Sequence, residues 1–249
     1  MCSVGLIGGT GLESWGEAAG TRDCTSRYGQ PSAALSEYRL GDLLVFFLPR
    51  HGPQHTIPPH AVNYRANIDV FRQVGVDGII AINAVGGIVS HSLPGTLTVP
   101  DQLIDYTRGR AHTFSMNSDD ELQHIEFAGP FDGRLRPALV KAAAAAEVAI
   151  VDGGCIAVTQ GPRLETAAEI RRLERDGCDL VGMTTMPEAA LAREAGLDYA
   201  SLCVTANRAA GLEHEPVSME AIEATLADAM VGVRKLLSAF FEELTNVTC

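Results

Sequence analysis

The chain has 249 residues and a formal net charge of -12, with 46% hydrophobic and 20% charged residues. This length allows one sizeable core, so we expect a single domain over residues 1–249. The charge and the absence of a Lys/Arg block argue against a nucleic-acid partner. No apolar stretch approaches the roughly 20 residues of a membrane helix, and the chain begins without a signal-like segment. We therefore expect a cytosolic protein with no membrane partner.

The six cysteines are scattered along the sequence and include no Cys-x-x-Cys pair. Several of them adjoin apolar runs, which is typical of small buried thiols. We expect the cysteines to be reduced and structural, and we expect no metal site.

Short apolar runs alternate with helical patterns along the chain. The runs predicted as strands are Val4–Ile7, Leu43–Leu48, Gly78–Ile82, Cys155–Val158, Leu180–Met183 and Ala200–Val204. The stretch from Ser92 to Phe131 is the least regular part of the sequence. Strands separated by helices predict an α/β fold, with a central mixed β-sheet flanked by helices.

Four helical patterns lie between and after these strands. They cover Val62–Val74, which stops at Gly75, then Pro137–Ala146, then Thr185 to near Gly196, and last a C-terminal helix capped by Ser218. Thr185 and Glu188 fit a capping box, in which Ser or Thr is followed three residues later by Glu. The C-terminal helix carries an apolar stripe that predicts core contact, formed by Ile222, Leu226, Met230, Val233, Leu237 and Phe240.

Polar or glycine-rich segments directly follow four of the predicted strands. They are Gly8–Gly11, Pro49–His55, Asn83–Ala84 and Gly182–Thr185. Ligands of open α/β sheets bind in the crevice beyond the carboxyl ends of the strands. We therefore expect these segments to meet at a common site.

Three of the segments have the composition of an oxyanion site. Arg50 supplies planar donors that stay protonated and His51 adds a switchable donor, although Arg50 taken alone fits a surface salt bridge equally well. Thr184 would place a hydroxyl beside the positive end of a helix dipole. The turn at Gly8–Gly11 could hold an oxyanion through its N–H groups and Thr10, but taken alone it is better explained as a tight turn. It lacks the third glycine of a dinucleotide fingerprint, which disfavours a nicotinamide oxidoreductase.

Four motifs occur in a characteristic order along the chain. They are Gly8-Gly9-Thr10-Gly11, then Pro49-Arg50-His51-Gly52 with His55, then Gln160-Gly161-Pro162-Arg163-Leu164-Glu165-Thr166, and last Met183-Thr184-Thr185-Met186-Pro187-Glu188. Together they resemble the purine nucleoside phosphorylase superfamily, in its methylthioadenosine phosphorylase branch, from near residue 4 to about residue 240. The resemblance implies a trimeric α/β enzyme that splits a purine nucleoside with inorganic phosphate. It implies a free base and a ribose 1-phosphate as products, and no metal or organic cofactor.

The resemblance also implies which residues contact each part of the substrates. Those expected at the phosphate are Thr10, Arg50, His51, Asn83, Ala84 and Thr184. Asn83 departs from the Thr that is usual at its position, which leaves its contact open. At the nucleoside, Met183 would lie under the ribose, His55 near the sugar and Leu164 beside the base. His124 would be lent by a neighbouring subunit of the trimer to the 5' end of the ligand.

Two residues predict which purine is bound. The adenine-specific branch carries Asp at the position of Asn207 and usually Ser at that of Glu165. A 6-oxopurine has an acceptor at O6 and a donor at N1, so Glu165 can accept from N1–H while Asn207 donates to O6 and accepts from N7–H. Adenine would face Glu165 acceptor to acceptor, a mismatch that can cost about 1 to 3 kcal/mol. Singly, Glu165 could be a capping carboxylate and Asn207 a turn residue; together they favour hypoxanthine or guanine.

The pocket expected at the 5' end of the sugar is apolar. Met219 and Ile222 occupy positions that line a thioether pocket in the methylthio branch, and Ala209 is also expected to contact the nucleoside. Such a pocket penalises an unpaired hydroxyl and so favours a methylthio group. Glu223, where an apolar residue is common, leaves inosine open as a substrate.

The expected reaction is phosphorolysis of 5'-methylthioinosine. Arg50 and His51 would hold the attacking phosphate, and Asn207 would stabilise hypoxanthine as it leaves protonated at N7. The nearest alternatives are a methylthioadenosine phosphorylase and a broader inosine/guanosine phosphorylase. Two other classes stay open: a nucleosidase that uses water, and a nucleoside sensor without turnover.

Overall fold

A mixed β-sheet forms the centre of the molecule. The computed structural model describes residues 3–116, 120, 122–213 and 218–246. The main path of the sheet has the order β2-β3-β4-β1-β5-β10-β9-β7, while β11 pairs with β5 and continues to β6 and β8. The strands are β1 Ser3–Gly8, β2 Gly20–Arg22, β3 Leu35–Leu40, β4 Leu43–Pro49, β5 Gly78–Gly87, β6 Leu97–Val99, β7 Gln102–Asp105, β8 Val151–Asp152, β9 Cys155–Val158, β10 Leu180–Gly182 and β11 Asp198–Arg208.

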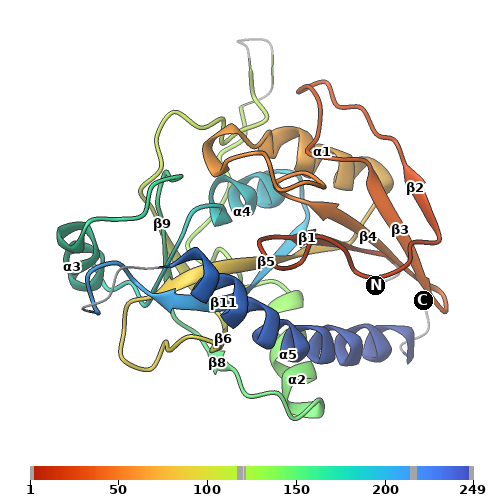
Figure 1. Cartoon of the computed structure of the whole chain (residues 1–249). Coiled ribbons are helices and arrows are strands. Elements are labelled where there is room, and N and C mark those ends of the chain that lie inside the picture. Colours follow the sequence, from red (N-terminus) through yellow and green to blue (C-terminus); the bar gives the residue numbers. More distant parts are fainter. Residues whose placement is uncertain (1–2, 117–119, 121, 214–217, 247–249) are drawn as a thin grey trace.

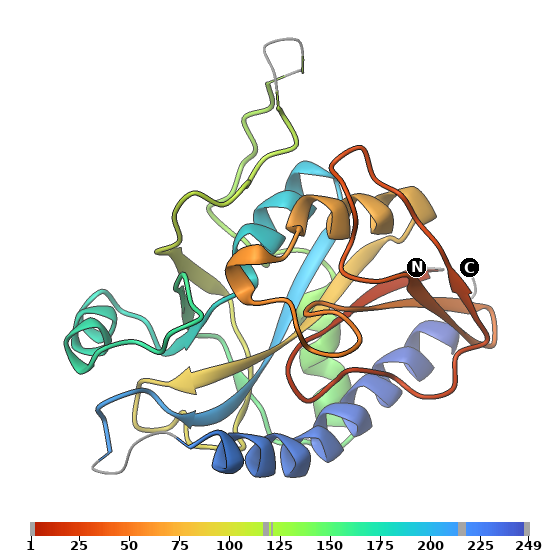
Figure 2. The ribbon, with the colours of Figure 1, turned by 45° about the horizontal axis from the view of Figure 1, so that its top comes forward.

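Helices cover both faces of this sheet. Helices α1 and α4 lie on one face, and α2 and α5 lie on the other (Figures 1 and 2). The helices are α1 Tyr64–Val74, α2 Leu135–Ala145, α3 Ala167–Arg175, α4 Thr185–Glu194 and α5 Met219–Asn246, with a short 3-10 helix at Pro59–Ala61. The predicted α/β fold, a single domain with a central mixed sheet flanked by helices, is confirmed.

The central strands are apolar on both faces because a helical layer covers each face. In β4, Val45 and Phe47 belong to the core cluster shared with α2 and α5. Phe46 and Leu48 belong to the cluster shared with α1 and α4. Strands buried on both faces appear in sequence as continuous apolar runs, which explains why these strands were predictable.

The ends of the first two helices differ from the prediction by a few residues, for identifiable reasons. Helix α1 begins at Tyr64 because the side chain of Asn63 accepts a hydrogen bond from the N–H of Ala66, and it ends at Gly75, which has a φ of 74°. Helix α2 begins two residues before Pro137 because the Asp198 carboxylate accepts from the N–H of Leu135 at 2.8 Å.

The predicted stripe on the C-terminal helix is confirmed as core contact. All six of its residues, from Ile222 to Phe240, are buried. Ser218 caps this helix, since its hydroxyl accepts from the N–H of Ala221 at 3.3 Å. Glu223 is exposed, so it faces solvent beside the buried stripe.

All six predicted strands are present, and two of them extend several residues beyond their predicted ends. Strand β5 continues through Asn83 to Gly87, and β11 continues through Asn207 to Arg208. The prediction that Asn83 follows its strand is therefore wrong, and so is the alternative of Asn207 as a turn residue. Five strands were missed: β2, β3, β6, β7 and β8. Each is short or partly exposed, and two of them lie in the irregular stretch after Ser92.

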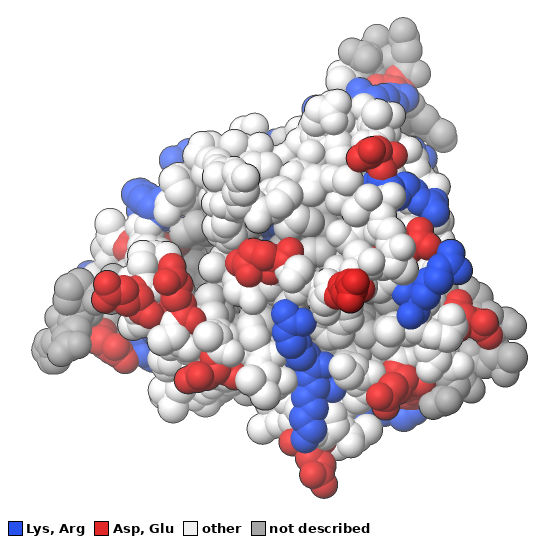
Figure 3. Space-filling view, turned by 45° about the vertical axis from the view of Figure 1, so that its right-hand side comes forward, with Lys and Arg blue, Asp and Glu red and all other residues white. Residues whose placement is uncertain are grey.

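The surface carries charges of both signs. On the face drawn in Figure 3, Lys and Arg side chains lie among Asp and Glu side chains and form no broad basic area. No helix among the described residues is long and apolar enough to cross a membrane. The four cysteines for which a state is described, Cys24, Cys155, Cys178 and Cys203, are free thiols. Cys2 and Cys249 lie outside the described residues.

Candidate active site

A cavity of about 390 Å³ lies where β1, β4, β5, β10 and β11 approach one another. Thirteen of the fifteen predicted site residues line it: Thr10, Arg50, His51, His55, Ala84, Leu164, Glu165, Met183, Thr184, Asn207, Ala209, Met219 and Ile222. Glu165 and Asn207 thus share one cavity with Arg50. The two predicted residues outside the lining are Asn83 and His124.

The cavity forms where the sheet loses a strand. Strand β5 pairs with β1 up to Ala81, and it pairs on the same path with β10 only at Gly86 and Gly87. The intervening residues of β5 therefore have no strand neighbour on this side, and Ala84 and Val85 line the cavity there. Such a gap in a sheet is a common location for ligands in α/β folds.

Arg50 reaches the cavity from the end of β4 and is held by a buried carboxylate. Its Nε and Nη2 donate to the two oxygens of Glu188 at 2.5 and 2.9 Å, and its Nη1 donates to the carbonyl of Ile82 at 3.1 Å. The side chains of Arg50 and Glu188 are 1% and 0% exposed. Of the five guanidinium N–H groups, three are used in this way and two are left for a ligand.

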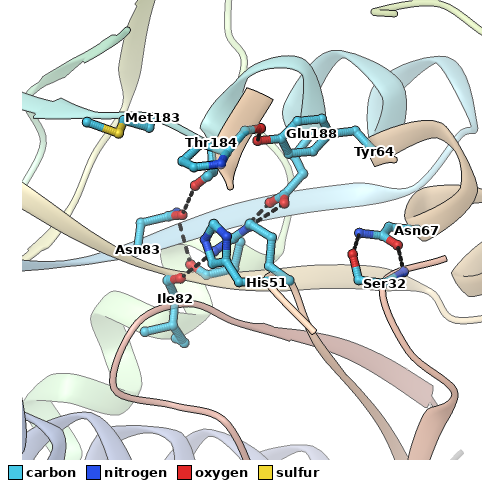
Figure 4. A network of polar contacts seen from close by, with 12 residues as sticks. Ser32, His51, Tyr64, Asn67, Ile82, Asn83, Met183, Thr184 and Glu188 are labelled. Carbon is cyan, nitrogen blue, oxygen red and sulfur yellow. Dashed lines mark hydrogen bonds and ion pairs between the residues drawn. The ribbon is translucent and has the colours of Figure 1, made fainter. Parts of the chain in front are cut away.

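Glu188 also keeps the guanidinium of Arg50 protonated. Burial alone would lower the pKa of Arg50, but the charge and hydrogen bonds of Glu188 raise it above its ordinary value. Tyr199 donates to Glu188 at 2.9 Å, which satisfies the carboxylate further. Figure 4 shows Glu188 within this network of polar contacts. The Arg50 donors are thus fixed in a charged, oriented state.

The predicted capping box at Thr185 is wrong. The N-cap of α4 is Thr184, it makes no side-chain capping bond, and Met186 is not helical. Glu188 does not turn back to the helix start because its carboxylate binds Arg50. Sequence pattern alone could not separate these two uses of the same glutamate. The prediction that Thr184 stands at a helix N-terminus is confirmed.

Asn83 lies behind Thr184 and does not line the cavity. The Thr184 hydroxyl donates to Oδ1 of Asn83 at 3.0 Å, and Nδ2 of Asn83 donates to the Ser201 hydroxyl at 2.7 Å (Figure 4). The structure therefore places Asn83 where it orients Thr184. A direct phosphate contact from Asn83 stays a prediction.

His51 is buried beside Arg50 with one nitrogen already paired. Its Nδ1 lies 2.8 Å from the carbonyl oxygen of Ile57, and since a carbonyl can only accept, Nδ1 carries a proton. Burial and then the charge of Arg50 lower the pKa of His51 to about 4. At neutral pH the ring is therefore uncharged, and Nε2 can only accept a hydrogen bond. This differs from the donor role expected from the sequence.

The pKa of His51 predicts how stability depends on pH. An unfolded His titrates near 6.5, so the unfolded chain binds more protons than the folded one between about pH 4 and 6.5. Stability should therefore fall as pH is lowered through this window, by about 3 kcal/mol from this residue. His51→Asn keeps a donor for Ile57 but cannot titrate.

The test compares urea unfolding of the wild type and His51→Asn at pH 6.5 and 4.5 without phosphate. Carboxylates titrate in both proteins, so the difference between the two slopes isolates His51. Parallel pH dependence in the two proteins would contradict the assigned pKa.

The glycine turn after β1 allows close approach of the backbone to Arg50. A Cβ on Gly9 would lie 2.5 Å from the carbonyl oxygen of Ile82 and 2.9 Å from Nη1 of Arg50. Only glycine therefore fits beside this guanidinium. Thr10 follows it into the cavity, where its hydroxyl lies 3.5 Å from Nε2 of His55.

The lining of the cavity includes Glu165 and Asn207, the two residues expected at the base. Asn207 sits at a register shift of β11, where Thr205 and Asn207 pair with consecutive residues of β5. A bulge of this kind changes the direction of a side chain. The Asn207 amide donates to the carbonyl of Arg208 at 2.6 Å, which leaves its second N–H and its oxygen available.

The wall of the cavity at Met183 is held by a buried arginine that sequence reasoning missed. Arg110 donates to the carbonyls of Met183 and Met186 at 2.7 Å each, and to the carbonyl of Gln160 at 2.8 Å. It thereby connects the motif that contains Glu165 with the one that contains Met183. No local pattern around Arg110 indicates this role, because its partners, the main-chain carbonyls and the Tyr64 hydroxyl at 3.3 Å, are distant in sequence.

The remaining lining is apolar and partly open. Met219 is 62% exposed and Leu164 is 43% exposed, whereas Ile222 is buried. His124 lies apart, exposed in the segment between β7 and α2 that extends away from the sheet in Figures 1 and 2. Its contribution to a neighbouring site stays a prediction. Among the described residues, no group of three or more His, Cys, Asp or Glu is placed to hold a metal ion.

The fold and the cavity together define a class of enzyme. In this cavity Arg50, which can bind an anion, lies with the carboxylate of Glu165 and the carboxamide of Asn207. The chain belongs to the Phosphorylase superfamily, whose model matches residues 3–242. The family expected from the sequence motifs is thereby confirmed.

Relatives cover nearly the whole chain. One from Pseudomonas syringae pv. tomato, named "Probable S-methyl-5'-thioinosine phosphorylase", is 49% identical over 244 residues, which are 96% of this chain and 98% of the relative. A protein of the same name from Xanthomonas campestris pv. campestris is 46% identical over 241 residues, 94% of this chain and 95% of its own. The solved structure of methylthioadenosine phosphorylase from Schistosoma mansoni with adenine has a TM-score of 0.94 at 32% identity, covering 100% of this chain and 93% of its own.

Proposed function

We propose that the protein catalyses phosphorolysis of S-methyl-5'-thioinosine, giving hypoxanthine and 5-methylthioribose 1-phosphate. The observation that carries this proposal is the shared cavity of Arg50, Glu165 and Asn207. A phosphorylase must hold an oxyanion and a base on opposite sides of a sugar, and these residues form two such ends. The names of the relatives from Pseudomonas and Xanthomonas support the same reaction.

At the base end, Glu165 accepts a hydrogen bond from N1–H of hypoxanthine. The free N–H of Asn207 donates to O6, and its oxygen accepts from N7–H. As the bond from C1' to N9 breaks, its electron pair passes into the purine ring, N7 takes up a proton from solvent, and the base leaves as neutral hypoxanthine. The Asn207 contact at N7 forms as this proton arrives, so it stabilises the transition state more than the substrate.

At the other end, the two free donors of Arg50 hold phosphate for attack on C1'. Thr10, Thr184 and the neutral His51 complete the phosphate site, with His51 accepting from a protonated phosphate oxygen. The phosphate oxygen forms its bond to C1' on the face opposite the departing base. Orientation in one cavity supplies much of the rate, since both reactants are held near the reacting carbon.

At the 5' end, Met219 and Ile222 contact the methylthio group, and Met183 lies under the ribose. An apolar lining favours a thioether over an unpaired hydroxyl. The reaction uses inorganic phosphate as co-substrate and no metal or organic cofactor. We place it in purine salvage in the cytoplasm, as the expected localisation.

We further propose that the chain works as a homotrimer in which His124 of one subunit reaches the 5' end of the ligand in another. The described residues beside it include exposed Met116 and Leu122, which are 49% and 71% exposed. Apolar side chains on a projecting segment favour burial against a second subunit. Light scattering at micromolar concentration checks this; a monomeric active enzyme would contradict it.

A methylthioadenosine phosphorylase is the second candidate. A relative from Nitrosopumilus maritimus with that name is 35% identical over 243 residues, and the solved structure from Schistosoma mansoni is also of a methylthioadenosine phosphorylase. Glu165 and Asn207 favour the 6-oxo substrate over this alternative. Inosine or guanosine as substrates would need the 5' hydroxyl to find a partner in the apolar end of the cavity.

The experiment separates these classes by product and phosphate dependence. Methylthioinosine is incubated with the protein, with and without phosphate, and the base and the sugar product are identified. The proposal predicts hypoxanthine and a sugar 1-phosphate only when phosphate is present. Release of hypoxanthine at the same rate without phosphate would show that the protein is a nucleosidase. No release in either condition would leave only a nucleoside sensor without turnover.

A further inference from the structure

Thr159 is the residue that holds the Glu165 carboxylate. Its hydroxyl oxygen lies 2.6 Å from Oε1 of Glu165 and 3.4 Å from the carbonyl oxygen of Gly182. A hydroxyl has one proton to donate, and the shorter contact to a carboxylate is the stronger one. The proton therefore goes to Oε1 of Glu165, and the other carboxylate oxygen, Oε2, stays free.

The neighbouring charged side chains make their hydrogen bonds with other partners than the Glu165 carboxylate. Arg163, two residues earlier, donates to both oxygens of Glu169 at 2.9 and 2.8 Å. Glu169 in turn completes the capping box of α3 with Thr166. Among the described residues, Thr159 is the only hydrogen-bond partner of the Glu165 side chain.

The place of Thr159 in the fold is rigid. It directly follows β9, and its N–H donates to the carbonyl of Gly182 at 2.8 Å at the end of the neighbouring β10. Gly182 itself lines the cavity. The Thr159 hydroxyl is thus fixed to the sheet, whereas Glu165 lies in the loop before α3, where a carboxylate without an anchor has rotamer freedom.

We infer that Thr159 is a positioning residue for discrimination between 6-oxopurine and 6-aminopurine nucleosides, acting by aiming the free oxygen of Glu165 at the N1 edge of the base. The inference rests on the proposed function. A 6-oxopurine gains a hydrogen bond from N1–H to this oxygen, and the gain depends on the orientation of the carboxylate. A 6-aminopurine has no proton at N1 and gains no hydrogen bond from that orientation, so its turnover should not fall when the carboxylate loses its anchor.

The test uses Thr159→Val, which keeps the shape of the side chain and removes the hydroxyl. We expect kcat/KM for methylthioinosine to fall about tenfold, the size of one net hydrogen bond, while kcat/KM for methylthioadenosine does not fall. The ratio between the two substrates should therefore fall at least about tenfold. Thr159→Ser, which retains the hydroxyl, should restore the ratio. The two nucleosides share one sugar, so a general loss of structure moves both equally.

Three outcomes would overturn the inference: an unchanged ratio in Thr159→Val, an equal fall for both substrates, or a ratio in Thr159→Ser as low as in Thr159→Val. Calorimetric binding of free hypoxanthine and adenine to Thr159→Ala gives a second measurement in case the Val variant folds poorly, and selective weakening of hypoxanthine is expected. If the wild type cleaves neither nucleoside, the proposed function itself fails and the inference fails with it. Cleavage of methylthioinosine with an unchanged ratio in the variants would overturn the inference alone.

Discussion

Replacing Asn207 by Asp is expected to shift the ratio of kcat/KM for methylthioinosine over methylthioadenosine by about 100-fold towards the adenine nucleoside. The reason is the loss of the donor to O6, because a carboxylate has only acceptors and would face O6 without a proton between them. The amino group of adenine can instead donate to Asp. Steady-state kinetics with both nucleosides at saturating phosphate measure the change.

This substitution should also lower kcat/KM for both nucleosides, an effect that cancels in the ratio between them. Asn207 donates to the carbonyl of Arg208 at 2.6 Å, and an Asp oxygen would be repelled there. The side chain must reorient, which lowers kcat/KM for both nucleosides alike. The KM for phosphate serves as the control and should change less than twofold, since Asn207 lies at the base end of the cavity. A ratio within threefold of the wild type would show that Asn207 does not contact O6.

Replacing Glu188 by Gln is expected to lower the free energy of unfolding by about 3 to 5 kcal/mol. Both oxygens of Glu188 bind Arg50, and neither side chain has access to water. The substitution leaves the Arg50 cation buried without its counter-charge, and an N–H of the new amide would face an N–H donor of the guanidinium. Urea unfolding without phosphate measures the loss.

The matched control is Glu243→Gln, which removes an exposed carboxylate of α5 that pairs with Lys141. The Lys141 and Glu243 side chains are 72% and 35% exposed, so the expected loss is below about 1 kcal/mol. Both substitutions remove one charge from one ion pair, so the difference between their losses in free energy of unfolding reports the effect of burial. Similar losses in the two variants would contradict the view that Glu188 stabilises the folded chain through Arg50.

The sheet was predictable from the sequence where its strands are buried on both faces. Strands such as β4 then appear as continuous apolar runs, and polar residues at their ends identify the edge where the site forms. The short strands were not predictable. For example, β8 has only two residues and is defined as a strand by its pairing with β6. Pairing across the sheet, which no local window contains, creates these elements.

The site residues were predictable to the extent that they lie in motifs. Arg50 and Glu165 stand in such motifs and line the cavity. The residues that orient them were not predictable, since Glu188 is 138 positions from Arg50 and occupies a pattern that also fits a helix cap. Thr159 lies next to a recognisable motif, but only coordinates show that its hydroxyl points to the glutamate.

The role of His51 needed coordinates for another reason. A histidine in a polar motif suggests a donor, and its burial beside Arg50 reverses that expectation by lowering its pKa to about 4. The carbonyl of Ile57 then determines which ring nitrogen carries the proton. Neither effect is a property of the local sequence, because both depend on how the chain folds around the ring.

The central claim is that a carboxylate and a carboxamide in one cavity select a 6-oxopurine for phosphorolysis. The most direct measurement is the ratio of kcat/KM for methylthioinosine over methylthioadenosine in the wild type at saturating phosphate and neutral pH. Two mismatched polar contacts of about 1 to 3 kcal/mol each predict a ratio of at least about 30. Equal turnover of the two nucleosides, or faster turnover of methylthioadenosine, would contradict the account.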